Sequence, residues 1–493
     1  MVVLSQERAP LFEELIRFAR QPLIPFHMPG HKAGRGLEPE WGFVKCLANM
    51  DLTEIPAFHW DSAWEEAEIL AAKFFGADRT FFLTQGASQG IIGGILGIFA
   101  PGDRVLVGLY CHGAVIRGII LAGINPVFVE SEFLTEFHIP VGIKLDSLRC
   151  RIREYPDCKG LIITNPSYQG VAGRLEVIRQ IIGQRILMID EAHGGHFRWM
   201  GLNGYNAQEF ADIWVHGTHK ILGSLTQTGM LHIKGGRIDP IQVKTKLALI
   251  TTTSPSYILL ASLDSNRRFL ASRGSSLFLD NLARIRDYKN RMAGVEGLRV
   301  LTDTELVGPD KRVVDPWKIS VHFQAPGITG YQADRILRDK YRIQSEYADL
   351  SQVTFMVAPW QREGELDELE KALRETASET ASETALETAL ETAVNDGLRN
   401  QAQPAISGDF PKSIPPLMMT PRDAALGPGE LVSLQKAAGR ISADVIAAYP
   451  PGIPLVTPGE LIRPCEIDYI QKIIAHKGLI NGVDPRGMAR VVR

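Results

Sequence analysis

The chain has 493 residues, 45% of them hydrophobic, which is enough to bury large cores in two or three domains. Its 53 basic and 56 acidic residues nearly balance, which argues against a surface for nucleic acid or for an anionic membrane and favours a small-molecule substrate. Five cysteines without CxxC spacing argue against a disulfide framework or a structural zinc site. The start carries acidic residues where a signal peptide needs an apolar core, and no stretch of about 18 apolar residues follows, so we expect a cytoplasmic protein.

The first predicted elements are an amphipathic helix around residues 11–19 and an irregular arm rich in Pro and Gly, "PLIPFHMPGHKAGRG". From about 65 to 275, short apolar runs alternate with helix-length segments. This pattern is typical of βαβ units, so it predicts an α/β fold with a mostly parallel sheet covered on both faces. The predicted strands are 80–83, 103–108, 126–130, 160–164, 186–190 and 212–216.

Beyond about residue 290 the pattern predicts a smaller α+β unit, with "WKISVHF" as a strand before a helix and a further strand. A period-four run, ETAS to ETAV, then occupies 375–394. Each cycle of four residues drifts by about 40° on a helix, so the run cannot keep one face buried, and we interpret it as a solvated helix or flexible insert. The prolines of "ADVIAAYPPGIPLVTPGE" indicate a stiff, folded surface segment. The predicted divisions are an arm (1–50), a large domain (51–290), a small domain (291–374), an insert (375–412) and a C-terminal domain (413–493).

Polar groups follow the predicted strands at their carboxyl ends, where open parallel sheets bind ligands. We expect one ring of loops to hold them. These loops are 84–90, 110–115, 164–170, 190–197 and 217–220.

Two of these loops carry a carboxylate and an amine that are costly to bury without a partner. Asp190 ends the apolar strand "ILMID", and Lys220 follows the end of another strand. A lysine can bond to an aldehyde, and a carboxylate can keep a pyridine nitrogen protonated, so together they indicate pyridoxal phosphate. Taken singly, each has a plainer interpretation, because a strand-end Asp is more often a cap or turn former.

The phosphate of such a cofactor needs donors without bulky side chains nearby. The stretch "GAS" at 86–88 opens a predicted helix and offers backbone amides and the Ser88 hydroxyl. His219 adds a possible donor, and His112 follows another strand at a place suited to stacking on the ring. Alone, His112 is more often a satisfied core or surface histidine, and "GAS" is a weak signal because small residues commonly precede helices.

Two unrelated interpretations of "DEAHGGHF" remain to be weighed. "DEAH" matches a helicase motif, but the chain lacks the GxxxxGK[ST] loop that a helicase needs. Asp190, Glu191, His193 and His196 could form a metal-hydrolase site. Adjacent residues at a strand end point in opposite directions, however, and there is no HExxH helix, so we expect no metal.

Several stretches together resemble the ornithine/lysine/arginine decarboxylase family, in a short form without an N-terminal wing domain. The resemblance implies the aspartate-aminotransferase-like fold of type I pyridoxal phosphate enzymes, in a homodimer or larger assembly with active sites at subunit interfaces. The stretches are "PFHMPGHKAG", "DLTEIP", "AAKFFGADRTFFLTQGASQG", "TNPSYQGV", "DEAHGGHF", "GTHKILGSLTQTGMLH", "TTTSPSYILLASLD" and "AAYPPGIPLVTPGE".

The resemblance also implies roles for individual residues. Lys220 would bind the cofactor covalently and Asp190 would pair with its ring nitrogen, with Ala192 under the ring and His112 stacked on the other face. The phosphate would be held by Ala87, Ser88 and His219, with Thr252 reaching across from the neighbouring subunit. The substrate would meet His193, and its distal cation would meet Glu346 and Asp349.

Three residues depart from the family pattern. Ala87 and Gly217 stand where hydroxyl residues often bind the phosphate, and Gly113 stands where a Lys usually follows the stacking histidine. Two lost hydroxyls, at roughly 1 to 3 kcal/mol each, predict weaker phosphate binding unless other donors replace them.

The expected activity is decarboxylation of a basic amino acid, with arginine ahead of lysine and ornithine, to give a polyamine precursor. Another enzyme with the same cofactor (an aminotransferase, an aldolase or a sulfur lyase) and a catalytically silent family member are the alternatives.

Overall fold

A computed structural model describes residues 5–21, 28–40, 42, 47–52, 60–306, 311–324, 328–394, 410–449 and 452–493. Parts of the predicted N-terminal arm and of "DLTEIP" lie outside these ranges. The chain divides into two compact units, each discontinuous in sequence. The first comprises residues 1–103, 158–163 and 175–279, and the second comprises 104–157, 164–174 and 280–493.

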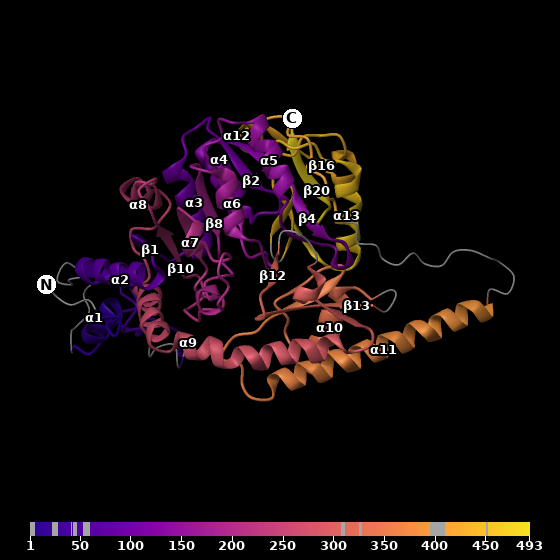
Figure 1. Ribbon diagram of the computed structural model, residues 1–493, viewed down its shortest axis with the longest axis horizontal. Helices are drawn as coiled ribbons and strands as arrows, with labels where there is room; N and C mark the ends of the chain where they lie inside the picture. Colours follow the sequence, from indigo (N-terminus) through magenta and orange to yellow (C-terminus); the bar gives the residue numbers. More distant parts are fainter. Residues whose placement is uncertain are drawn as a thin grey trace. The chain divides into compact units, whose positions relative to one another are not determined.

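The first unit contains five hydrogen-bonded strands in the order β1-β10-β9-β8-β6. Figure 1 labels β1, β10 and β8 among them. Their bounds are β1 (Arg79–Leu83), β10 (Gly229–Ile233), β9 (Ile213–His216), β8 (Ile186–Asp190) and β6 (Gly160–Thr164). β8 and β9 run parallel, whereas β10 runs antiparallel to both of its neighbours. The strands predicted here are confirmed to within one residue. β10 was missed because a glycine and a histidine interrupt its apolar run, "GMLHI".

The first unit also contains helices. They are α1 (Pro10–Ala19), α2 (Trp60–Phe75), α3 (Gly86–Ile98), α6 (Leu175–Ile182), α7 (Ala207–Phe210), α8 (Pro240–Leu249) and the first part of α9 (Tyr257–Ala293). The glycines of α3 let it pack closely on α8, since a Cβ added to Gly97 would lie 2.8 Å from the Cα of Val243. This packing fixes α3, whose first turn carries predicted site residues.

The second unit begins with a parallel pair, β2 (Arg104–Gly108) and β3 (Asn125–Val129), joined by α4 (Gly113–Ala122). A four-stranded sheet follows in the order β11-β13-β15-β14, together with α10 (Gly330–Tyr341), which confirms the predicted strand, helix and strand. Its strands are β11 (Leu298–Val300), β13 (Lys318–Phe323), β15 (Gln352–Met356) and β14 (Tyr347–Ala348). Smaller elements are β4 (Ser131–Leu134), β5 (Ile139–Ile143), α5 (Leu145–Glu154), β7 (Val171–Ala172) and β12 (Val313–Val314).

The period-four run is helical and continues α11 (Glu365–Val394) without a break at residue 375. Thr376 and Ala377 are buried, at 0% and 2% exposure. The start of the run therefore belongs to the packed small domain and not to a solvated insert. The periodicity of the run did not predict this burial, because these buried residues lie in its first helical turn, directly after the amphipathic stretch "ELDELEKAL".

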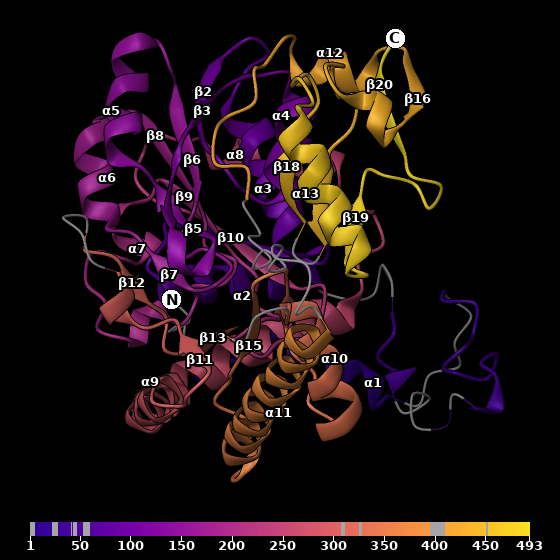
Figure 2. The ribbon, with the colours of Figure 1, turned by 90° about the vertical axis from the view of Figure 1, so that its right-hand side faces the viewer.

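We call residues 410–493 the C-terminal domain. Its elements are α12 (Pro421–Leu426), β16 (Gly429–Ser433), β17 (Ile446–Tyr449), β18 (Ile453–Val456), α13 (Pro464–Ala475), β19 (Leu479–Asn481) and β20 (Met488–Val492). Figure 2 shows α13 beside β18 and β19, and residues of these elements share one hydrophobic core. Ile446 and Val456 are fully buried in it, so the Pro-rich segment predicted to lie on the surface contributes to the core instead.

Among the helices in the described ranges, none is long and apolar enough to cross a membrane.

Candidate active site

Asp190 and Lys220 lie on neighbouring segments of the first unit. Asp190 is the last residue of β8 and is paired with Val215 of β9, and Lys220 follows five residues later. Beyond the strands the two segments stay tied, because the Gly217 N–H donates to the Ala192 carbonyl at 3.2 Å. The structure thus brings the predicted carboxylate and amine to adjacent strand ends.

The amine of Lys220 has a specific neighbour. Its Nζ lies 2.7 Å from Nε2 of His193, in the loop that follows Asp190. Since a lysine ammonium can only donate, His193 accepts this hydrogen bond at Nε2. The histidine predicted to border the substrate therefore contacts the predicted covalent lysine.

The carboxylate of Asp190 is 3% exposed. One of its oxygens, Oδ1, accepts the N–H of Ala192 at 3.1 Å, which orients the carboxylate at the strand end. A buried carboxylate is stable only with donors or a cation nearby. Ala192, predicted to pack under the cofactor ring, is itself buried.

Ala87 and Ser88 occupy the first turn of α3, where backbone N–H groups have no partner within the helix. Gly86 starts the helix with a φ of +71°, a conformation that favours glycine. The start of β10 packs directly against this turn, since a Cβ on Gly229 would lie 3.1 Å from the Ala87 nitrogen. The N-terminus of α3 can therefore serve as an anion site. Gly229, which packs against it, was not identified from the sequence.

His219 lies beside the same turn, with Cε1 4.0 Å from a Cβ built on Gly86. Its Nδ1 is 2.6 Å from the carbonyl oxygen of Thr228, which can only accept, so Nδ1 carries a proton. Nε2 can then donate to a phosphate only when the ring is an imidazolium. His219 could therefore serve as the predicted phosphate donor only in its charged form.

Gly217, one of the departures, has a steric explanation. A Cβ there would lie 3.0 Å from the Ala192 carbonyl oxygen and 3.2 Å from Cδ of Lys220. A serine at this position would press on both the backbone of the Asp190 loop and the lysine stem. Gly217 supplies no hydroxyl, but it lets the Lys220 side chain pack closely against the backbone.

Sequence reasoning missed a buried polar chain behind the site. Glu191 Oε2 lies 2.8 Å from His216 Nε2, His216 Nδ1 lies 3.2 Å from His232 Nε2, and His232 Nδ1 lies 2.8 Å from Thr80 Oγ1. Burial raises the pKa of Glu191 and, together with the neighbouring His216 and Arg198, holds the pKa of His232 well below its usual range. The sequence did contain a signal for these contacts. Successive side chains in a strand point to opposite faces of the sheet, so Glu191 should point to the face opposite Asp190.

Thr252 lies in the exposed loop between α8 and α9. Its hydroxyl is 3.2 Å from Ser254 Oγ and accepts the Ser254 N–H at 3.2 Å, which orders the loop. The residue borders a cavity of about 470 Å³ that Thr84 and Gln89 also line. Its predicted contact with a neighbouring subunit remains a prediction.

The other predicted site residues belong to the second unit. His112 is the N-cap of α4, and its Nδ1 accepts the Ala114 N–H at 3.1 Å, so a neutral ring carries its proton on Nε2. Glu346 Oε1 accepts the hydroxyl of Tyr168 at 2.7 Å, which joins "SEYAD" to the "TNPSYQG" loop. A carboxylate backed by a phenol remains able to bind a cation.

Asp349 is engaged within its own turn. Oδ1 accepts the N–H groups of Ser351 and Gln352, at 2.6 and 2.9 Å, and Oδ2 accepts the Tyr347 hydroxyl at 2.6 Å. Burial raises the pKa of this carboxyl. These contacts favour a turn-forming role, so of the two carboxylates Glu346 is the better placed for a substrate cation.

The donor set of the first unit fits pyridoxal phosphate. It offers a primary amine at Lys220, a buried carboxylate at Asp190, and an anion site formed by a helix N-terminus and His219. Gly86, Gly217 and Gly229 keep bulk away from it, as the Cβ distances above indicate. Within the described part of the chain, no group of three His, Cys, Asp or Glu residues is arranged to hold a metal ion.

Comparisons with known proteins point to the same chemistry. Family models match residues 9–364 as "Orn/Lys/Arg decarboxylase, major domain" and residues 407–485 as the C-terminal domain of the same family. An arginine decarboxylase of Bacillus anthracis is 36% identical over 483 residues, 96% of this chain and 94% of that protein.

Two solved structures support the predicted fold class. The lysine decarboxylase of Francisella novicida gives a TM-score of 0.83 at 21% identity, covering 98% of this chain and 81% of that one. The ureidoglycine-glyoxylate aminotransferase of Bacillus subtilis gives 0.51 at 13% identity, covering 75% and 94%. At these identities the likeness concerns the fold alone.

Proposed function

Because this chain belongs to the Orn/Lys/Arg decarboxylase family, we propose that it decarboxylates a basic amino acid with pyridoxal phosphate as cofactor and arginine as the preferred substrate. The products would be carbon dioxide and an amine that serves as a polyamine precursor. The preference for arginine is supported by the name of the Bacillus anthracis relative.

The observation that carries the proposal is the placement of Asp190 and Lys220 at adjacent ends of β8 and β9. A covalent amine and a ring-nitrogen partner must approach one aromatic aldehyde from different positions, and two neighbouring strand ends provide them. The N-terminus of α3 supplies the third contact that the phosphate requires.

When bound, pyridoxal phosphate supplies an electron sink for the pair left at the α-carbon after carbon dioxide leaves. Asp190 would keep the ring nitrogen protonated, and burial strengthens that pairing because water is excluded. Lys220 would hold the cofactor through Nζ, and His193 Nε2, 2.7 Å away, can accept a proton from the Lys220 ammonium so that the amine is neutral and able to bond. Glu346 would bind the distal cation of the substrate, held in place by Tyr168.

We further propose that the protein works as a homodimer or larger assembly. The support is the exposed loop of Thr252, whose hydroxyl is hydrogen-bonded to Ser254 within the same loop. Light scattering combined with the effect of Thr252→Ala on cofactor affinity tests this assignment.

The decisive experiment incubates purified protein and cofactor with arginine, lysine and ornithine, each carrying a labelled carboxylate, and measures both labelled carbon dioxide and product amine. We expect release from arginine at the highest kcat/KM. Consumption of a keto acid without carbon dioxide would identify an aminotransferase instead. The proposal would be contradicted if the wild type, with cofactor added, showed no visible absorption band and had the same spectrum as its Lys220→Ala variant.

A further inference from the structure

The C-terminal domain contacts α4 at both of its ends. α4 starts at Gly113, directly after His112, and the His112 side chain caps its first turn. Any displacement of this helix end therefore displaces the histidine ring. The residues involved all belong to the second unit, and several come from the Pro-rich segment that the site described above does not use.

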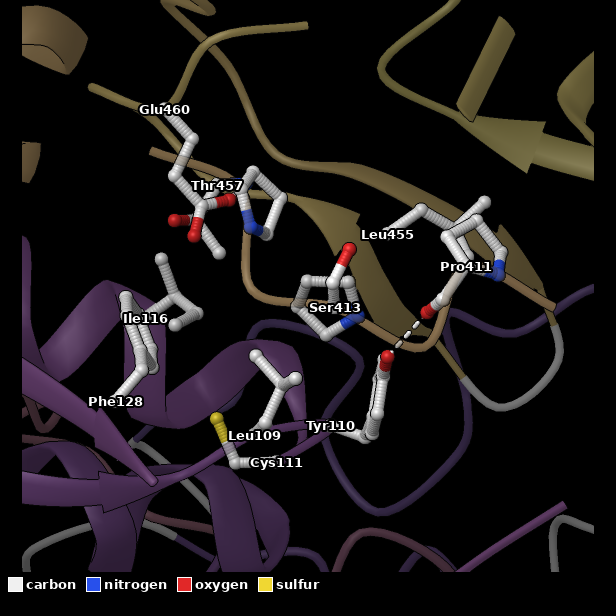
Figure 3. A pocket seen from close by; sticks show the side chains of 12 residues that line it. Leu109, Tyr110, Cys111, Ile116, Phe128, Pro411, Ser413, Leu455, Thr457 and Glu460 are labelled. Carbon is white, nitrogen blue, oxygen red and sulfur yellow. Dashed lines mark hydrogen bonds between the residues drawn. The ribbon is translucent and has the colours of Figure 1, made fainter. Parts of the chain in front are cut away.

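At the N-terminal end, Tyr110 is the anchor. Its hydroxyl donates to the carbonyl of Pro411, drawn as the dashed line in Figure 3. Its ring meets Phe410 edge-on at 4.9 Å and Phe133 edge-on at 5.5 Å. The φ of Tyr110 is +65°, a conformation that a tyrosine rarely adopts and that surrounding contacts must maintain.

A second contact lies one residue past His112. A Cβ added to Gly113 would lie 3.4 Å from the carbonyl oxygen of Gly452, in the turn directly before β18. In the family pattern a lysine usually stands at this position. So long a side chain would have to displace this turn or adopt a conformation that avoids it. The glycine lets the backbone of the C-terminal domain approach the first turn of α4.

At the C-terminal end, Arg422 of α12 donates through Nη1 to the carbonyl oxygens of Ile120 and Leu121, at 3.0 and 2.9 Å. Carbonyls in the last turn of a helix lack intrahelical partners, and a cation there is favoured by the helix dipole. α12 and α4 lie side by side along this contact (Figure 1).

Between the two ends, the surfaces are closely packed. A cavity of only about 20 Å³ remains between them, room for a single water molecule. Figure 3 shows its walls: Leu109, Cys111, Ile116 and Phe128 on one side, and Ser413, Leu455, Thr457 and Glu460 on the other.

We propose that the C-terminal domain is a positioning element of the active site, which holds α4 at both ends and thereby fixes the ring of His112. Tyr110 and Arg422 are positioning residues in this scheme, since neither needs to touch substrate or cofactor. The inference rests on the proposed function only for the role of His112 as the stacking residue.

The test compares Tyr110→Phe, Arg422→Ala and the double variant. Arg486→Ala is the matched control, because Arg486 is an exposed arginine of the same domain whose side chain, among the residues that the structure describes, bonds to Asp484 in its own turn. In cofactor-free protein, amide hydrogen exchange of residues 109–122 should become about fivefold to tenfold faster in Tyr110→Phe, the factor that loss of one hydrogen bond implies, and at least as much faster in Arg422→Ala, which loses two. The control should leave it unchanged.

With cofactor added, we expect the visible circular dichroism band to change and kcat to fall more than KM rises, since the stacking ring has moved while the substrate's other contacts remain. Arg422→Lys, which keeps a cation at the helix end, should recover part of the loss. Unchanged exchange of 109–122 in the double variant would overturn the proposal, and so would an unaltered visible spectrum in variants of an active enzyme.

Failure of the proposed function gives a different result. A wild-type protein that binds no cofactor and releases no carbon dioxide would remove the role of His112. The exchange measurement on cofactor-free protein would still decide whether the C-terminal domain fixes α4.

Discussion

Replacing Glu460 by glutamine should stabilise the C-terminal domain at alkaline pH and change it little at acidic pH. Glu460 is 1% exposed, and Oε2 accepts the N–H of Thr457 at 2.6 Å, a bond that a glutamine oxygen can also accept. Burial raises the pKa of the Glu460 carboxyl from 4.5 to about 7; Thr457 and Arg463 oppose the shift and Glu466 adds to it. The variant therefore removes a titrating group and keeps its hydrogen bond.

The sign follows from which state holds the proton. In the unfolded chain the carboxyl ionises around pH 4.5, whereas in the folded chain it stays protonated to about pH 7. Between these values the folded state binds more protons, so the wild type loses stability as pH rises through this window and bears the full cost above it. Integrated from pH 5 to pH 8, the loss is about 2 to 3 kcal/mol, at 1.36 kcal/mol per unit of pKa.

Native-state hydrogen exchange of β17 and β18 amides, measured from pH 5 to pH 8 and corrected for intrinsic exchange, gives the difference between variant and wild type. Glu430→Gln is the control: Glu430 is a partly exposed residue of the same domain whose pKa is lowered by the hydrogen bond from Arg440, so its replacement cannot stabilise at high pH. A difference between Glu460→Gln and wild type that stays constant across this pH range would refute the reasoning.

Three further outcomes are expected. Asp190→Asn should keep cofactor binding but lower kcat on the order of a thousandfold, because several kcal/mol of ring-nitrogen pairing is lost. A kcat for carbon dioxide release equal to that of the wild type would contradict the role of Asp190. Gly229→Ala should weaken cofactor affinity measured by absorbance titration, since its Cβ would lie 2.9 Å from the His216 carbonyl oxygen behind the helix end; unchanged affinity would show that this packing is not needed. Ala377→Asp should destabilise the small domain by about 2 to 4 kcal/mol in urea unfolding, because it buries an unpaired charge. An unchanged free energy of unfolding would instead support the interpretation of the repeat as a solvated helix.

The parts of the fold predicted well from sequence were those governed by local periodicity. Six buried strands were placed to within one residue because short uninterrupted apolar runs between helix-length segments are typical of strands in a parallel sheet covered on both faces. β10 was missed because His232 and Gly229 break its run, and their presence is explained only by partners distant in sequence, Thr80 and the turn at Ala87.

The candidate site shows the same division. The strand-end rule selected Asp190, Lys220 and the N-terminus of α3 as candidates, and the structure places Asp190 and Lys220 after neighbouring strands because topology brings the carboxyl ends of such strands together. The chain from Glu191 through His216 to His232 could not be found this way, because which side chains meet behind a sheet depends on register. The engagement of Asp349 in its own turn was hidden for a similar reason: it depends on backbone geometry over residues 349–352.

The unbroken course of α11 through the ETAx run gives that run a simple geometry. Adding or deleting one tetrad would lengthen or shorten the rod by about 6 Å and rotate its end by roughly 40°. The buried residues at its base, Thr376 and Ala377, would keep their places whatever the copy number. Tandem duplication would thus change the position and direction in which α11 ends in discrete steps, without repacking the small domain.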